Sequence, residues 1–249
     1  MKSRTEWYET FFDGMYSYVL AAQFDRQQSL DHARLVRKLL KLRKGQRVVD
    51  IPCGQGRLTI PLAETGLQMT GVDLTESFLK TARRKSQKER LRIRYVHSDM
   101  RNIEFDEEFH AAFNWFGSFG YFSDADNLVF CKKVFNALRP GGRFLVEGPN
   151  KTRIKNDFIE RTEQNINGVS IKARNKWHRN KNRILSEWTF TRGGKRERHR
   201  VDVRVFDAAE IRSLLRAAGF HNIECYGRPP LGRFTRHSRR LMAVGRKPH

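Results

Sequence analysis

Two acids and two glycines in the first third of the chain are spaced as a nucleoside-binding turn requires. Asp50 lies within a short β-branched run, Gly54 and Gly56 follow it, and Asp73 lies 19 positions after Gly54. Glycines in a turn between a strand and a helix let the backbone approach a ligand closely, and an acid about 20 residues further on accepts ribose hydroxyls. The spacing therefore predicts that a nucleoside binds at this turn.

Details of the turn separate two kinds of nucleoside cofactor. A dinucleotide fingerprint has a third glycine, so that the pyrophosphate rests on the helix N-terminus, but here that position is Thr59. Asp50 places a negative charge at the end of the strand, which favours a cationic ligand and opposes a diphosphate. S-adenosylmethionine carries an ammonium and a sulfonium, so the turn favours it. An NAD-dependent oxidoreductase is the least favoured alternative.

The segments that must position these residues alternate between β-branched runs and amphipathic stretches. This alternation predicts a doubly wound α/β fold with a mostly parallel, seven-stranded Rossmann-like sheet. Its expected strands are 47–51, 68–72, 91–96, 109–115, 143–147, 221–226 and 240–244. Its expected helices are 75–88, 124–138 and 207–218.

Two further segments lie outside this alternation. Apolar side chains recur every three or four residues over 6–24, which predicts one amphipathic helix, and residues 31–42 predict another. We expect these to form an N-terminal helical lid over residues 1–44, with the ligand-binding domain at 45–249. Three extended runs separated by turn residues predict an antiparallel β insertion, a basic cap at about 150–206.

Five motifs in order resemble the class I S-adenosylmethionine-dependent methyltransferases, in particular the enzymes of that family that act on small molecules. The matching segments are Asp50-Ile51-Pro52-Cys53-Gly54-Gln55-Gly56, Val72-Asp73-Leu74, Ser98-Asp99-Met100-Arg101, 114–122 and Leu138-Arg139-Pro140-Gly141-Gly142. In the family these segments form the cofactor loop, the ribose acid, an acid near the adenine, the loop facing the methyl group and a turn before the fifth strand. The resemblance covers roughly residues 45–148 and 207–247.

The resemblance implies a methyltransferase that binds S-adenosyl-L-methionine. By similarity, the cofactor-binding residues are Tyr16, Asp50, Pro52, Cys53, Gly54, Gly56, Asp73, Leu74, Asp99, Met100, Asn114 and Trp115. Tyr8 is the alternative to Tyr16 for contact with the methionine end. Methyl transfer mainly needs alignment of the acceptor and exclusion of water, so no catalytic base is assigned. No metal is expected.

The acceptor is less well defined. The formal net charge is +22, and residues 151–249 hold 25 of the 49 basic residues but only 9 of the 27 acidic ones. A field of this sign attracts anions. We therefore expect a small, anionic acceptor held by cations of the cap, namely Lys172, Arg174, Lys176, Arg179, Lys181 and Arg183.

Two other functions remain open. An RNA methyltransferase would use the basic cap to follow a phosphate backbone, with Trp177, Trp188 and Phe190 as stacking surfaces. The Asn/Asp-Pro-Pro-Tyr loop of enzymes that methylate base amino groups is absent, which favours a small acceptor. A non-catalytic scaffold that binds S-adenosylmethionine is the third possibility.

Cysteine use and hydropathy indicate the compartment. Three widely spaced cysteines form neither a disulfide framework nor a CxxC metal site. The segment from Met1 to Trp7 reaches a negative charge before any apolar run, and no run approaches the ~20 residues of a membrane span. We therefore expect a cytoplasmic protein without a membrane partner. The sequence does not give the oligomeric state.

Overall fold

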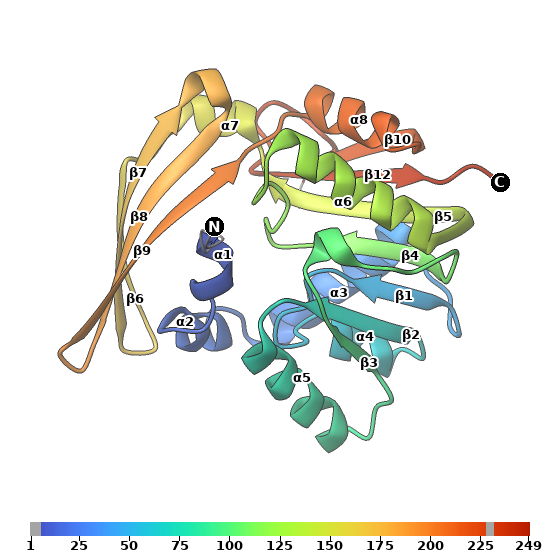
Figure 1. Cartoon of the computed structure of the whole chain (residues 1–249), viewed down its shortest axis with the longest axis horizontal. Coiled ribbons are helices and arrows are strands. Elements are labelled where there is room, and N and C mark those ends of the chain that lie inside the picture. Colours follow the sequence, from blue (N-terminus) through green and yellow to red (C-terminus); the bar gives the residue numbers. More distant parts are fainter. Residues whose placement is uncertain (1–5, 228–231) are drawn as a thin grey trace, which may run out of the picture.

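The computed structural model describes residues 6–227 and 232–249, which form two sheets (Figure 1). Met1 to Thr5 belong to the segment from which we predicted a cytoplasmic protein, and they lie outside the described residues. The larger sheet has the order β11-β10-β12-β5-β4-β1-β2-β3. Its strands are β1 (Arg47–Asp50), β2 (Gln68–Asp73), β3 (Arg94–His97), β4 (Phe109–Asn114), β5 (Leu138–Pro149), β10 (His221–Gly227), β11 (Gly232–Arg233) and β12 (Arg240–Arg246).

This sheet confirms the expected fold class. Strands β3, β2, β1, β4 and β5 pair in parallel, whereas β12 runs antiparallel to β5 and β10. All seven expected strands form, and the two-residue β11 is added at the edge. Strand β5 begins at Leu138, before the Pro-Gly-Gly turn that we expected to precede it, because Phe109 pairs with Leu138 ahead of a register shift.

Helices cover both faces of the larger sheet. They are α3 (Arg26–Leu40), α4 (Thr59–Glu64), α5 (Glu76–Lys88), α6 (Asp124–Ala137) and α8 (Ala208–Ala217). Successive buried residues of β4 alternate between two apolar clusters: Ala112 packs with Phe130 and Leu215, and Phe113 packs with Val36 and Leu62. Helix α3, which we expected in the lid, therefore contributes to the core. The six-residue α4 was not expected.

The first residues form two short helices, α1 (Trp7–Thr10) and α2 (Tyr16–Ala22), instead of one. We call residues 6–24 the leader. The expectation of a continuous helix was wrong because a contact distant in sequence breaks it: the Met15 N–H donates to the Glu197 carboxylate at 2.7 Å. A Cβ on Gly14 would collide with the same carboxylate. The leader is therefore shaped by a residue far along the chain.

The insertion forms a separate four-stranded antiparallel sheet, the cap sheet, and not the three strands expected. After α7 (Lys151–Asn156) come β6 (Arg161–Ile166), β7 (Val169–His178), β8 (Arg183–Arg192) and β9 (Lys195–Arg204). Its apolar face packs on the leader, with Ile171 and Phe190 in one cluster with Phe11. Figure 1 shows α1 and α2 between the cap sheet and the rest of the molecule.

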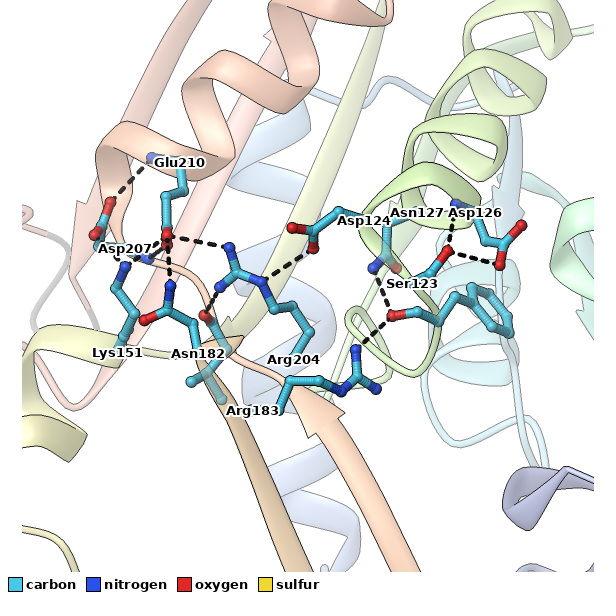
Figure 2. A network of polar contacts seen from close by, with 12 residues as sticks. Ser123, Asp124, Asp126, Asn127, Lys151, Asn182, Arg183, Arg204, Asp207 and Glu210 are labelled. Carbon is cyan, nitrogen blue, oxygen red and sulfur yellow. Dashed lines mark hydrogen bonds and ion pairs between the residues drawn. The ribbon is translucent and has the colours of Figure 1, made fainter. Parts of the chain in front are cut away.

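Two buried cations hold the cap sheet to the core (Figure 2). Lys151, which is 5% exposed, pairs with Asp207 at 2.7 Å and with Glu210 at 2.6 Å. Arg204 at the end of β9 pairs with Glu210 at 3.1 Å and with Asp124 at 3.0 Å. Burial is the largest single influence and raises the pKa of Asp207 and Glu210, but the hydrogen bonds from Lys151 and from backbone N–H groups, together with the nearby positive charges, outweigh it. Both pKa values therefore lie below their ordinary values.

Candidate active site

A cavity of about 470 Å³ opens beside the carboxyl ends of β1 and β2, where ligands bind in open α/β sheets. Its volume falls within the range of small-molecule sites. Eleven of the twelve residues expected to bind the cofactor line it: Tyr16, Asp50, Pro52, Cys53, Gly54, Gly56, Asp73, Leu74, Asp99, Met100 and Trp115. Asn114 is not among the lining residues; it is fully buried and its amide nitrogen lies 3.9 Å from the Met100 sulfur.

The acid at the end of β2 fixes the glycine turn after β1. Asp73 Oδ2 accepts the N–H of Gly54 at 2.7 Å, and Oδ1 accepts the N–H of Thr75 at 2.8 Å. Gly54 and Gly56 have φ values of +55° and +78°, which favour glycine. A Cβ on Gly54 would meet nothing nearer than Phe78 at 4.0 Å. The backbone beside Gly54 is therefore open to a ligand.

Asp50 is a buried carboxyl group with a neutral hydrogen-bond partner. It is 2% exposed and accepts the hydroxyl of Thr59 at 2.7 Å. Burial raises its pKa to about 8; Thr59 and Arg57 lower the pKa, and the Asp73 charge raises it further. Thr59, which breaks the dinucleotide pattern, is thus the residue that positions Asp50. A cationic group beside this carboxyl would favour its ionised form.

Asp99 is paired within its own loop. Both of its oxygens accept hydrogen bonds from the Arg101 guanidinium, the shortest at 2.7 Å. Arg101 Nη2 also donates to the Tyr8 hydroxyl at 2.9 Å, and the guanidinium carbon of Arg101 lies 4.3 Å from the centre of the Phe122 ring. Arg101 therefore ties the leader to the loop after β3, a role that the sequence pattern did not indicate.

Aromatic side chains form one wall of the cavity. They come from the leader, from α5 and from the loop after β4: Tyr8, Phe12, Tyr16, Phe78, Tyr121 and Phe122. The rings of Tyr8 and Tyr121 are stacked with centroids 6.2 Å apart. Burial raises the pKa of Tyr16 to about 12 and moves that of Tyr121 above its ordinary value. Both phenols therefore stay protonated at neutral pH.

The cap sheet does not roof this cavity. None of the six cap cations expected to hold the acceptor is among the lining residues, because the leader lies between the cap sheet and the cavity. Arg183 instead donates to the carbonyl oxygen of Phe122 at 2.8 Å and pairs with Asp202 at 2.7 Å. The cap thus supports the aromatic wall from behind.

Arg57, directly after the glycine turn, also lines the cavity and was not assigned a role from the sequence. Its guanidinium lies 4.2 Å from the centre of the Phe24 ring and 5.6 Å from that of Phe116.

Phe116 has a φ of +67°, and its N–H donates to buried Glu147 at 2.7 Å. Glu147 is in turn paired with Arg240. Only the position of Arg57 beside Gly56 signalled its place in the site.

Other site types have less support in the described part of the chain. No group of three or more His, Cys, Asp or Glu residues there is arranged to hold a metal ion. None of the helices described is both long and apolar enough to cross a bilayer.

Residues 48–142 match a family model described as a methyltransferase domain. They contain the Asp50 to Gly56 turn, Asp73, Asp99 and the aromatic loop after β4. Residues 48–142 therefore form a methyltransferase domain. S-adenosyl-L-methionine is the cofactor of such methyltransferases, and the residues present fit it. The buried Asp50 carboxyl suits a cationic group, the Asp73 carboxyl suits ribose hydroxyls, and the turn at Gly54 is open.

Individual relatives agree on the methyltransferase domain. The putative methyltransferase YqeM of Bacillus subtilis is 33% identical over 118 residues, which cover 47% of each chain. This chain thus spans about half the length of the curated relatives it matches.

Solved structures share the fold over nearly the whole chain. The CcbJ methyltransferase of Streptomyces caelestis has a TM-score of 0.81 at 18% identity and covers 97% of this chain and 99% of its own. The 1,6-didemethyltoxoflavin-N1-methyltransferase of Burkholderia thailandensis, solved with its acceptor and S-adenosylhomocysteine, has a TM-score of 0.61 at 20% identity. It covers 97% of this chain and 87% of its own.

Proposed function

We propose that the protein transfers a methyl group from S-adenosylmethionine to a small acceptor bound against the aromatic wall. The observation that carries this proposal is the pair formed by Asp73 and Gly54 beside the buried Asp50. Asp73 keeps lone pairs for ribose hydroxyls, Asp50 suits the ammonium, and Arg57 suits the carboxylate of the methionine part. When bound, the cofactor supplies a methyl group on a cationic sulfur.

The acceptor is proposed to be small and without net negative charge. The expectation of an anionic acceptor depended on the cap cations, which lie outside the cavity lining. Among the described residues that line the cavity, carboxyl groups outnumber cations. The carboxyl groups belong to Asp25, Asp50, Glu64, Asp73, Glu89 and Asp99, and the cations to Arg26, Arg57 and Lys85. The structurally similar toxoflavin enzyme, named for a small heterocyclic acceptor, supports the size.

The cavity residues act by position and not by proton transfer. No histidine is among the described residues that line the cavity, and the phenols of Tyr16 and Tyr121 hold their protons. The aromatic wall excludes water and attracts a sulfonium group through its ring faces. Proximity of aligned reactants supplies about 7–11 kcal/mol in such reactions. The acceptor therefore brings an unprotonated nucleophile of its own.

Calorimetry with S-adenosylhomocysteine, followed by radiolabelled methyl transfer to a panel of amino sugars, phenols and heterocycles, tests this function. Binding together with turnover on a neutral or cationic acceptor supports it. Binding without turnover on the whole panel indicates the scaffold alternative. Protection of the fold against heat by NAD and not by S-adenosylhomocysteine would indicate an oxidoreductase.

A further inference from the structure

The outer face of the cap sheet, turned away from the leader, is densely cationic. Side chains alternate between the two faces of a strand, and the apolar residues Val169, Ile171 and Ala173 face the leader. Three positions on the opposite face of the same strand, Lys172, Arg174 and Lys176, are exposed. We define the outer face by its exposed cations, Arg161, Lys172, Arg174, Lys176, Arg196, Arg198 and Arg200.

Strand register places like charges beside one another on this face. Arg174 lies directly opposite Arg161 on β6, and on its other side Glu187 separates it from Arg200. Like charges directly opposite in an antiparallel pair destabilise a sheet. Along β9, Arg196, Arg198 and Arg200 repeat at about 7 Å. The arrangement therefore costs stability unless an anion is bound.

Few of these cations are neutralised within the chain. Lys172 pairs with Glu163 at 2.9 Å, and Arg200 pairs with Glu187 at 3.3 Å. Within residues 6–227 and 232–249, no ion pair involves Arg161, Arg174, Lys176, Arg196 or Arg198. Five of the seven cations that define the outer face are thus without an ion-pair partner among the described residues.

We propose that the outer face is a docking surface for the phosphate backbone of RNA. Five of its seven cations are arginines, whose planar guanidinium groups bind phosphate through two parallel hydrogen bonds. The intervening positions Ser170, Thr189 and Thr191 add hydroxyl groups, which also contact phosphates. A membrane-binding face instead carries large apolar side chains, and the only one between these cations is Leu185, which is partly buried.

The position of this surface separates docking from catalysis. The leader and the cap sheet lie between the outer face and the cavity. An RNA phosphate backbone bound to the outer face is therefore remote from the aromatic wall. Binding there does not bring an RNA base into the cavity for methylation. RNA serves as an anchor for the protein and not as the methyl acceptor.

Fluorescence anisotropy with a labelled single-stranded RNA of about 20 nucleotides, at about 50 and 200 mM salt, tests the proposal. The triple variant Arg196→Gln, Arg198→Gln, Arg200→Gln is expected to bind at least about tenfold more weakly at low salt. Because three phosphate contacts are lost, the slope of the logarithm of the RNA association constant against the logarithm of the salt concentration should become less negative by about 2. Binding of S-adenosylhomocysteine and methyl transfer should stay unchanged.

The matched control removes three exposed cations from core helices: Lys38→Gln, Lys88→Gln, Lys132→Gln. It is expected to change RNA affinity less than about twofold. Equal weakening in both triple variants would overturn the proposal, because net charge alone would then explain binding. Absence of RNA binding by the unaltered protein, or tighter binding to vesicles rich in phosphatidylserine than to RNA, would also overturn it.

Discussion

Asp73 and Gly54 are joined by a hydrogen bond of 2.7 Å from the glycine N–H to the carboxylate. The acid at the end of β2 therefore shapes the turn that follows β1, in addition to facing the cavity. One side chain couples the two halves of the proposed cofactor site, since a change at Asp73 alters both the cavity lining and the backbone beside it.

Replacing Asp73 by Ala should weaken S-adenosylhomocysteine binding about 100-fold, corresponding to about 2.7 kcal/mol. The change also leaves the N–H groups of Gly54 and Thr75 without their acceptor, at about 1–3 kcal/mol each if they stay dry. Calorimetry and urea unfolding measure the two effects separately. An unchanged dissociation constant in the folded variant would remove Asp73 from the cofactor site.

Ligand binding should release a proton from Asp50. Its pKa of about 8 in the free protein means that the carboxyl is mostly protonated at pH 7, and a cationic ligand favours ionisation. Calorimetry at pH 7 in two buffers of different ionisation enthalpy should show close to one proton released per S-adenosylhomocysteine. Asp50→Asn should abolish this release. The same release from the Asn variant would contradict the assignment.

Asp50 also affects how the stability of the ligand-free protein changes with pH. Its folded pKa lies above the ordinary value, so the folded state binds more protons than the unfolded state between about pH 4 and 8. The contribution of this group to stability therefore falls as pH rises through that window. Asp50→Asn should remove this decline, so that the unfolding midpoint of the variant rises relative to that of the parent as pH increases from about 4 to 8. A difference between variant and parent that changes in the opposite sense would contradict the direction.

Gly120→Ala should disrupt the aromatic wall. Gly120 has a φ of +106°, and a Cβ there would strike the carbonyl oxygen of Arg204. The matched control is Gly168→Ala, at φ +73° with open space around it, which carries only the backbone strain of about 1–2 kcal/mol. Unfolding and turnover should show a larger loss for Gly120→Ala. Equal losses in both variants would show that the contact with Arg204 is unimportant.

Lys151→Met should loosen the junction of cap and core at neutral pH. Removing this cation leaves the partly buried carboxylates of Asp207 and Glu210 without their shared partner. We expect the free energy of unfolding to fall by about 3 kcal/mol, the lower end for such changes, because both carboxylates are partly exposed. The two carboxyls have lowered pKa values, so their contribution is present above about pH 4 and lost as pH falls. The stability difference between variant and parent, measured by urea unfolding, should therefore shrink in acid; a difference independent of pH would contradict this.

Local patterns predicted the parts of the fold whose signals are local. The β-branched run at 47–51 predicted β1, and the glycine turn after it predicted a loop that lines the cavity. Strand β6 was missed because five of its six residues, from Arg161, are exposed and polar, which hides the alternation. The break in the leader was missed because it depends on Glu197, whose contact with Met15 spans 182 residues.

The site was predictable to a similar extent. Asp50 and Asp73 could be predicted because each follows a recognisable strand pattern, and the carboxyl ends of parallel strands lie at the same edge of the sheet. Arg101 and Arg57 were not assigned, because a contact such as that of Arg101 with Tyr8 joins segments far apart in the chain. The cap cations were expected to hold the acceptor, but they do not line the cavity. The sequence gives the order of these cations along the chain, but it does not show that the leader packs between the cap sheet and the cavity.

The packing of Phe11 on Phe190 has a consequence for synthesis. More than two thirds of the polypeptide separates the two rings, so the leader leaves the ribosome long before the strand on which it rests exists. Contacts of such sequence separation form late. The leader therefore reaches its final place beside the cavity only after β8, which carries Phe190, has been made.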